Sequence, residues 1–233
     1  GLATHRQKSS GVLWRAGVVV GSASTLWRGP SVAVVLPDGE QVPGEVRGVD
    51  ARTDLAAVTF TSGSLPVAER AVAAQPRVGD FVFAVGREPS GLTQASFGHV
   101  GMTGGQWRTW RGGSVDRLIR LDGGLYPGLD GAPVADAKGQ VLGVASSAFS
   151  RHHGVVLPVA TVELVLDQLL AHGRVQHGYL GIAVQPARAM LDGVPVQGLL
   201  VSSLAEDGPA ARGGLLVGDV IVKLGGEPVG SPD

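Results

Sequence analysis

The sequence predicts an all-β fold of the barrel or sandwich type, interrupted by one long helix. Short Val-rich runs alternate with Gly, Pro and Asp over residues 1–150. Turn signals recur there about every 8–12 residues, a spacing typical of barrels and sandwiches. Glycine accounts for 37 of the 233 residues, so we expect many turns and few long helices.

The clearest local signal is a hairpin in the first third of the chain. The tight turn at residues 37–39, Pro-Asp-Gly, joins the apolar run Val32–Leu36 to Gln41–Val49. Further apolar runs between turns are expected to be strands: Gly11–Trp14, Val18–Val20, Leu55–Phe60, Phe81–Val85, Thr93–Met102, Asp116–Arg120, Ala132–Ala135 and Val141–Ser146.

One segment has the spacing of an amphipathic helix. It begins near Thr161, where Val162, Val165, Leu166 and Leu169 recur with a helical period, and Gly173 is suited to end it in a left-handed conformation. Short strand-like runs then return, with a short helix expected at Pro209–Arg212: Leu180–Val184, Gly198–Ser202 and Val220–Leu224.

Composition excludes several classes. Hydrophobic residues make up 44% of the chain and charged residues 17%, which favours a packed core over disorder. No apolar run reaches the ~18–20 residues that span a bilayer. A net charge of −1 gives no reason to propose nucleic acid as a partner. The absence of cysteine excludes disulfides, thiolate metal sites and a cysteine nucleophile.

The two ends of the sequence carry expectations of their own. The chain starts at Gly1 without the charged and apolar regions of a signal peptide, so we expect such a peptide to be absent or already removed. Residues 231–233, Ser-Pro-Asp, have the pattern of a helix start, which indicates a truncated product.

Three segments, in order and spacing, resemble the HtrA/DegP-type branch of the chymotrypsin-like serine proteases. That branch carries T-A/N-A-H, D-x-x-T-D-L-A and P-G-N/F-S-G-G-P-L, followed by G-x-V-V-G. Residues 18–26, 48–56 and 126–134 match these motifs, and residues 139–144 match the last. Residues 179–182 and 216–221 resemble two landmarks of a PDZ domain, so the resemblance covers nearly the whole chain.

The resemblance implies two six-stranded chymotrypsin-like β-barrels, a linker helix and an incomplete PDZ domain. It places a trypsin-like domain at residues 1–158, with barrels at about 1–66 and 77–158. The linker helix falls at 159–176 and the partial PDZ domain at 177–233. It also implies an extracytoplasmic location, a polypeptide ligand, assembly as a trimer, and neither a cofactor nor a metal.

The chain departs from the family at two of its three catalytic positions. Ser24 stands at the position of the histidine and Asp130 at that of the nucleophilic serine, so only the carboxylate, Asp54, is retained. A hydroxyl has no useful proton affinity near neutral pH, and a carboxylate is a poor nucleophile towards an amide. The mechanism of the family is therefore not expected in this chain.

In the family the oxyanion hole is formed by backbone N–H groups that map to Gly128 and Asp130. A short anionic side chain beside two free donors suggests a hypothesis, in which the Asp130 carboxylate folds onto these N–H groups and plugs the hole. A second hypothesis treats Asp54 and Asp130 as an acid–base pair, with one pKa raised by like-charge repulsion.

Other polar residues have weaker patterns. His152 and His153 most simply form an exposed loop, with a substitute base or a metal site as the alternative. His5 and His99 are poor candidates for catalysis, and His177 suits an interdomain hinge. The aromatic and basic run from Trp107 to Arg111 favours loop packing or a subunit contact over stacking on nucleic acid.

In the PDZ-like part, Tyr179, Leu180, Gly181 and Ile182 match the loop that holds a peptide's terminal carboxylate. Residues 182–184 would receive the peptide as an added strand. The helix that forms the other wall of the groove would follow Asp233, so we expect this site to be incomplete.

These features lead to one main hypothesis and two alternatives. The first is a non-catalytic relative of the HtrA proteases that binds polypeptides or assembles with active partners. The second is an active serine-type endopeptidase with a non-standard or altered triad. The third is a structural subunit.

Overall fold

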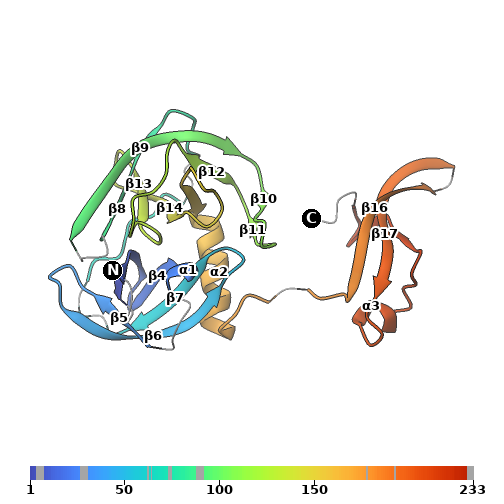
Figure 1. Ribbon diagram of the computed structural model, residues 1–233, viewed down its shortest axis with the longest axis horizontal. Helices are drawn as coiled ribbons and strands as arrows, with labels where there is room; N and C mark the ends of the chain where they lie inside the picture. Colours follow the sequence, from blue (N-terminus) through green and yellow to red (C-terminus); the bar gives the residue numbers. More distant parts are fainter. Residues whose placement is uncertain are drawn as a thin grey trace. The chain divides into compact units, whose positions relative to one another are not determined.

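The computed structural model describes residues 1–3, 8–26, 31–61, 63, 65–72, 75–87, 92–176, 178–191 and 193–229. The chain divides into two compact units, Gly1–Val175 and Gln176–Asp233 (Figure 1). His5, His177 and the helix start expected at residues 231–233 lie outside the described residues. No helix of the described part is long and apolar enough to cross a membrane.

The first part of the larger unit is a seven-stranded antiparallel sheet in the order β2-β1-β5-β6-β7-β4-β3. Its inward side chains form an apolar core that includes Leu2, Val19, Val34 and Val58. The short helix α1, Ala23–Leu26, follows β4 directly. The strands are β1 Leu2–Ala3, β2 Lys8–Ser9, β3 Gly11–Arg15, β4 Val18–Ser22, β5 Ser31–Val35, β6 Gln41–Asp50 and β7 Leu55–Phe60.

This sheet is a half-barrel rather than the closed six-stranded barrel that the resemblance implies. Its two edges, β2 and β3, are consecutive pieces of chain separated only by Ser10. The backbone N–H of Ser10 donates to the carbonyl of Gly128 at 3.1 Å instead of pairing within the sheet. The Ser10 Oγ donates to the same carbonyl at 2.5 Å. The contact between Ser10 and Gly128, which separates β2 from β3, therefore also connects the sheet to the second part of the larger unit.

The second part is a closed barrel in the order β12-β15-β14-β13-β8-β9, which confirms the predicted all-β class (Figure 1). Every residue of β14 and β15 is buried. A small ribbon, β10 Trp107–Arg108 with β11 Ser114–Val115, branches from the barrel. The barrel strands are β8 Phe81–Arg87, β9 Thr93–Gly104, β12 Leu118–Leu121, β13 Pro133–Asp136, β14 Val141–Ser146 and β15 Val155–Pro158.

Helix α2, Val159–His172, begins two residues before the predicted start and ends as expected at Gly173. Gly173 has φ +72° and its N–H donates to the carbonyl of Leu169 at 2.9 Å. The apolar face of the helix packs into the core of the larger unit. On its polar side, Glu163 accepts a hydrogen bond from Trp14 Nε1 at 2.9 Å and pairs with Arg70 at 3.0 Å. The helix is therefore fixed on the larger unit by both apolar and charged contacts.

The smaller unit is built on a long hairpin, β16 Ile182–Leu191 and β17 Val194–Leu204, to which β18 Val220–Ile221 adds a third strand. Both hairpin strands are longer than the runs predicted from the sequence. Among the described strands, β16 pairs with β17 alone, so its other side is a sheet edge. Helix α3, Pro209–Arg212, is as predicted, and β19 Lys223–Leu224 pairs with β20 Glu227–Pro228.

Candidate active site

A tight turn between β6 and β7 positions Asp54. Asp50, at the end of β6, accepts hydrogen bonds from the backbone N–H groups of Arg52 and Thr53, both at 3.2 Å. It also accepts one from the Thr53 hydroxyl at 2.5 Å. Asp54 then adopts a left-handed conformation with φ +58°, which aspartate tolerates better than most residues. This turn directs the Asp54 side chain into the protein, where it is completely buried.

Three serines surround the Asp54 carboxylate. Its Oδ1 accepts the backbone N–H of Ser24 at 2.8 Å. Its Oδ2 accepts the hydroxyls of Ser22 at 2.9 Å and Ser146 at 2.7 Å. The hydroxyls of Ser22 and Ser24 lie 2.8 Å apart. Hydrogen bonds from protein groups thus satisfy both carboxylate oxygens, as a buried anion requires.

Burial raises the pKa of the Asp54 carboxyl, and the hydrogen bonds from Ser146, Ser24 and Ser22 oppose that rise without cancelling it. The Asp54 carboxylate is bonded to Ser22, Ser24 and Ser146, whereas that of Asp130 is bonded to Ser147. No hydrogen bond between the two carboxyl groups supports the acid–base pair that we considered from the sequence, and the pair stays a prediction.

Ser24 lies in α1, and its side chain is exposed. The helix is anchored to the Asp54 turn, because the N–H of Ala23 donates to the carbonyl of Asp54 at 3.0 Å. Ser24, which the family resemblance assigns to the position of the histidine, thus lies beside the carboxylate. It presents a hydroxyl instead of an imidazole.

A loop with two left-handed glycines carries Asp130. Gly128 has φ +90° and Gly131 has φ +82°. A Cβ on Gly131 would lie 2.6 Å from the carbonyl oxygen of Ser10 and 2.7 Å from the nitrogen of Ser22, so only glycine fits there. Leu129 is fully buried. The loop is therefore pressed against the half-barrel and has little freedom to change its shape.

The Asp130 carboxylate is bonded to a single residue. Its Oδ1 accepts the N–H of Ser147 at 2.7 Å, and its Oδ2 accepts the Ser147 hydroxyl at 3.0 Å. Within the described part of the chain, the backbone N–H groups of Gly128 and Asp130 donate to no protein acceptor. The predicted plug of the oxyanion hole is therefore wrong, because Ser147 supplies two donors and the carboxylate turns towards it.

No imidazole of the described residues makes a hydrogen bond or ion pair with Asp54, Ser24 or Asp130. His99 Nε2 pairs with Asp122 at 3.3 Å. His152 and His153 lie in the loop after β14, and the N–H of His153 donates to Ser150 Oγ at 3.2 Å. The described residues contain no cluster of three or more histidines and carboxylates that could hold a metal ion.

The loop from Trp107 to Gly113 packs against both sides of the site. Thr109 Oγ1 donates to the carbonyl of Arg52 at 2.7 Å, next to the Asp54 turn. Trp110 Nε1 donates to the carbonyl of Ala148 at 3.2 Å, and Arg111 stacks 4.6 Å over the Trp110 ring. Thr109 is buried and Trp107 partly buried, whereas the Trp110 ring is 73% exposed, so the loop packing favoured from the sequence holds for only part of the run.

Comparison with known proteins identifies the family. A model of the trypsin-like peptidase domain matches residues 9–144, and a PDZ domain model matches residues 200–233. The chain is 34% identical to a probable periplasmic serine endoprotease, DegP-like, of Brucella suis over 97% of its own length and 46% of the relative's. It is 31% identical to the protein so described from Halomonas elongata, over 97% of this chain and 49% of the relative.

A solved structure agrees with these sequence matches. The HtrA-type protease AlgW with a decapeptide superposes with a TM-score of 0.81 at 26% identity, over 96% of this chain and 71% of that one. This chain belongs to the HtrA/DegP-type serine proteases with a PDZ domain. It spans about half the length of the two DegP-like relatives.

In this HtrA/DegP-type chain, the structure brings Ser24 and Asp54 into direct contact. Asp130 is linked to them through two consecutive serines at the end of β14: Ser146 donates to Asp54, and Ser147 donates to Asp130. Sequence reasoning missed Ser22, Ser146 and Ser147. A signal was present for Ser146, because it lies two residues after the G-x-V-V-G match, at the end of a buried strand.

The predicted peptide-binding residues of the HtrA/DegP-type chain lie at the start of β16. Tyr179 and Leu180 are exposed, and Gly181 is left-handed with φ +71°. The carbonyl of Leu180 accepts the N–H of Ala210, at 3.0 Å, so the loop is tied to α3. Ile182 begins the strand whose outer edge is unpaired among the described strands.

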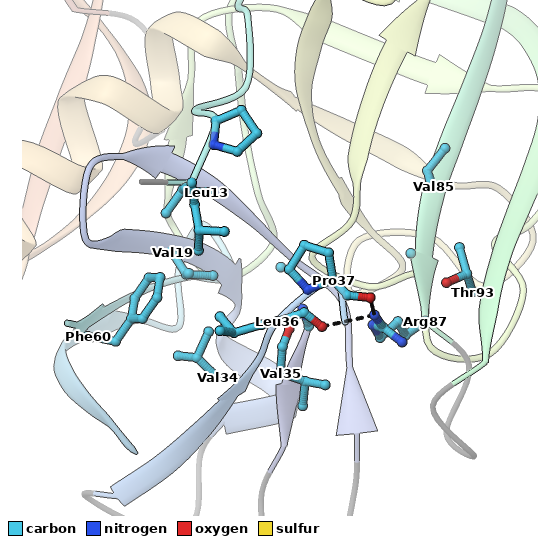
Figure 2. Close-up of a pocket in the computed structure, with 15 residues that line it drawn as sticks. Leu13, Val19, Val34, Val35, Leu36, Pro37, Phe60, Val85, Arg87 and Thr93 are labelled. Atoms are coloured by element: carbon cyan, nitrogen blue, oxygen red, sulfur yellow. Dashed lines mark hydrogen bonds between the residues drawn. The ribbon is translucent and has the colours of Figure 1, made fainter. Parts of the chain in front are cut away.

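A separate pocket of about 330 Å³ in the larger unit is lined by residues of both the half-barrel and the closed barrel (Figure 2). Leu13, Val19, Val34 and Phe60 make its apolar wall, and Arg87 stands at the other side. Arg87 Nη2 donates to the carbonyls of Leu36 and Pro37, both at 3.0 Å. Ser24, Asp54 and Asp130 are not among the described residues that line it.

Proposed function

We propose that this chain is a catalytically inactive HtrA-like homologue that binds polypeptides or assembles with partners in protein quality control. Acyl transfer in this fold needs a hydroxyl nucleophile and an imidazole that removes its proton. The chain has Ser24 where that base belongs and Asp130 where that nucleophile belongs. Loss of one triad member typically costs roughly 10⁴–10⁶ in kcat, and two are lost.

The observation that carries this proposal is the set of donors around Asp54. In an active triad the carboxylate orients an imidazole by accepting its N–H. In this chain the carboxylate accepts hydrogen bonds from the Ser22 and Ser146 hydroxyls and from the Ser24 backbone N–H, and from no imidazole of the described residues. Asp54 therefore holds α1 and β14 in place without orienting a base, and its Oδ1, with a single donor, could still accept the N–H of an imidazole introduced at position 24.

The polypeptide ligand is proposed from the second unit and from the relatives. One similar structure is described with a bound decapeptide, and another with a tripeptide. In this chain the β16 edge is free for strand addition among the described strands, and the loop 179–181 precedes it. The DegP-like relatives are named periplasmic, and we extend an extracytoplasmic location, and a trimer as the possible assembly, to this chain on the family resemblance.

The decisive experiment restores the two missing groups. We expect the unaltered chain to bind fluorescently labelled casein without cleaving it, and S24H/D130S to gain cleavage. The matched control is S24H/D130S/D54N, which keeps both new groups and loses the carboxylate that orients the imidazole. Its cleavage should fall by about 10⁴-fold, as expected when the imidazole is held in the wrong tautomer.

Each arm has an outcome that decides between hypotheses. Cleavage by the unaltered chain that persists through repeated purification and vanishes in D54N would establish the alternative, an active endopeptidase with a non-standard triad. Absence of casein binding would contradict the polypeptide-binding role. Cleavage by S24H/D130S alone would show that the remaining site is intact and that activity was lost through these two positions.

A further inference from the structure

The pocket of Figure 2 lies where the two parts of the larger unit meet. Val34 of β5 and Phe60 of β7 line it from the half-barrel, and Val85 and Arg87 of β8 line it from the closed barrel. Its volume of about 330 Å³ is in the range of sites that hold small molecules. The pocket therefore has the size of a ligand site, and its lining indicates which ligand it suits.

The half-barrel side of the pocket is apolar. Val19 and Val34 are buried members of the half-barrel core. Leu13 and Phe60 pack against that core and are only half-buried. Side chains of this kind make no hydrogen bonds, so a polar group placed among them would be desolvated without a partner. This wall therefore favours a hydrocarbon group.

A positive charge stands opposite this apolar wall. Among the described residues that line the pocket, Arg87 has the only ionisable side chain. Its Nη2 donates to the carbonyls of Leu36 and Pro37, both at 3.0 Å, and its backbone N–H donates to Ser10 Oγ at 3.0 Å. These contacts hold both the backbone and the guanidinium of Arg87 at the pocket.

The charge of Arg87 acts on other atoms of the pocket. Gly1 is also a lining residue, and the pKa of its amino group is lowered to about 6, first by burial and then by repulsion from the Arg87 guanidinium. A charge that disfavours a cation at this position favours an anion there by the same Coulomb interaction. The described lining residues include no acidic side chain to oppose it. The pocket therefore suits an anion that carries a hydrocarbon group.

We propose that this pocket binds a medium-chain fatty acid, with its tail against the half-barrel wall and its carboxylate beside Arg87. The volume of about 330 Å³ corresponds to about eleven water-sized groups of about 30 Å³ each. Octanoate, which has roughly ten groups of that size, fills it. The carboxyl end of a polypeptide has the same charge, but its peptide groups find no partner on the apolar wall.

The proposal is independent of polypeptide binding at the degenerate site. Ser24, Asp54 and Asp130 are not among the described residues that line the pocket. Binding or failure to bind casein therefore leaves the fatty-acid site untouched, and the two functions are tested by separate ligands.

A series of carboxylates tests the fit with the unaltered chain. In isothermal titration calorimetry, each added methylene from butanoate through hexanoate to octanoate should tighten binding about fourfold. Decanoate should gain less than about twofold over octanoate, because the pocket is then full. Absence of saturable octanoate binding would overturn the site, and so would a fourfold gain per methylene that continues to decanoate.

Two further ligands test the charge and the source of the carboxylate. Octylammonium has the same tail as octanoate with the opposite charge, and it should bind at least about tenfold more weakly. N-acetylleucine carries a carboxylate beside a peptide group, and it should also bind at least about tenfold more weakly. Equal binding of octylammonium would remove the role of the charge. Equal or tighter binding of N-acetylleucine would assign the pocket to polypeptide ends and overturn the fatty acid.

The variant R87Q tests the charge from the side of the protein. Glutamine keeps N–H donors for the carbonyls of Leu36 and Pro37 and loses the charge. Octanoate affinity should fall at least about tenfold, whereas neutral octan-1-ol should bind both proteins within about twofold. The matched control R77Q removes a positive charge at an exposed side chain outside the pocket and should leave octanoate affinity unchanged. Equal octanoate affinity in R87Q and the unaltered chain would contradict the proposal.

Backbone amide NMR locates the bound octanoate. The signals of Val19, Val34 and Gly86 should shift on titration, because these residues line the pocket. Those of Gly181 and Ile182 should not shift, and they are informative because their loop is the proposed site for a peptide carboxylate. Shifts confined to Gly181 and Ile182 would place octanoate in the smaller unit and overturn the pocket as its site.

Discussion

Asp54 and Asp130 are the same residue type at adjacent positions of one degenerate site, yet their surroundings differ in every respect. Asp54 is completely buried, has a left-handed backbone and accepts hydrogen bonds from three different residues. Asp130 is half-buried and accepts both of its hydrogen bonds from Ser147. The first carboxylate is held from several sides and the second from one.

The difference indicates which positions of the proposed degenerate site the fold needs and which it does not. The structure around Asp54 depends on its carboxylate, since α1, β4 and β14 each contribute a donor to it. A position that supports several segments cannot change without leaving buried donors unsatisfied. Ser24 is exposed and Asp130 half-buried, so a side chain at either position can change without exposing buried donors.

The largest expected effect tests this asymmetry at Asp54. D54A should unfold with a free energy about 3 kcal/mol lower than D54N. Both variants lack the charge, but asparagine tolerates φ near +58° and its amide can bond all three serine partners. Alanine strains the backbone and leaves the N–H of Ser24 without its acceptor. Urea unfolding followed by tryptophan fluorescence measures the gap, because Trp14 is fully buried.

A gap below about 1 kcal/mol between D54A and D54N would contradict this account. It would mean that the three serine donors find water or other partners once the side chain is removed. Asp54 would then be no more structural than Asp130, and the comparison between the two sites would fail.

Much of the fold follows from the sequence because turns and periodicity are local signals. The runs Leu55–Phe60 and Val141–Ser146 are strands with the predicted bounds, and Pro209–Arg212 is the predicted helix. The hairpin of β16 and β17 is longer than predicted, because exposed polar residues such as Gln185 and Arg188, which carry no apolar signal, continue the antiparallel pairing. The interruption at Ser10 depends on a contact with Gly128, 118 residues away, which no local pattern contains.

The candidate site shows the same contrast between what local sequence patterns predict and what depends on long-range contacts. Motif order identifies Ser24, Asp54 and Asp130 as neighbours, and the structure places them in one network through Ser146 and Ser147. The direction of the Asp130 carboxylate was predicted wrongly, because the choice between its own N–H groups and Ser147 depends on where β14 ends. That is a property of the folded barrel and leaves no trace in the residues next to Asp130.

A smaller effect concerns pH at the buried carboxylate. Burial raises the pKa of Asp54 above its ordinary value of 3.8, so the folded state holds this proton more tightly than the unfolded state. The group therefore contributes stability below the ordinary pKa, and this contribution is lost as pH rises through the raised pKa. D54N cannot titrate, so its stability relative to the unaltered chain should increase as pH rises above about 4.

The measurement is the difference in free energy of unfolding between D54N and the unaltered chain, from urea curves at several pH values. Taking the difference cancels the titration of all other groups. A difference that falls with rising pH would mean that the serine hydrogen bonds outweigh burial and hold the pKa of Asp54 below its ordinary value. The carboxylate would then stabilise the fold as an anion.

The smallest effect is expected at Asp130, where the contrast with Asp54 is sharpest. D130A and D130N should differ in free energy of unfolding by less than about 1 kcal/mol, because the freed Ser147 N–H and hydroxyl are exposed and can bond to water. A gap as large as that at Asp54 would show that Asp130 supports the fold from its position in the loop 128–131. A small gap would show that Asp130 adds little to the stability of the fold, whereas the Asp54 carboxylate accepts donors from α1, β4 and β14.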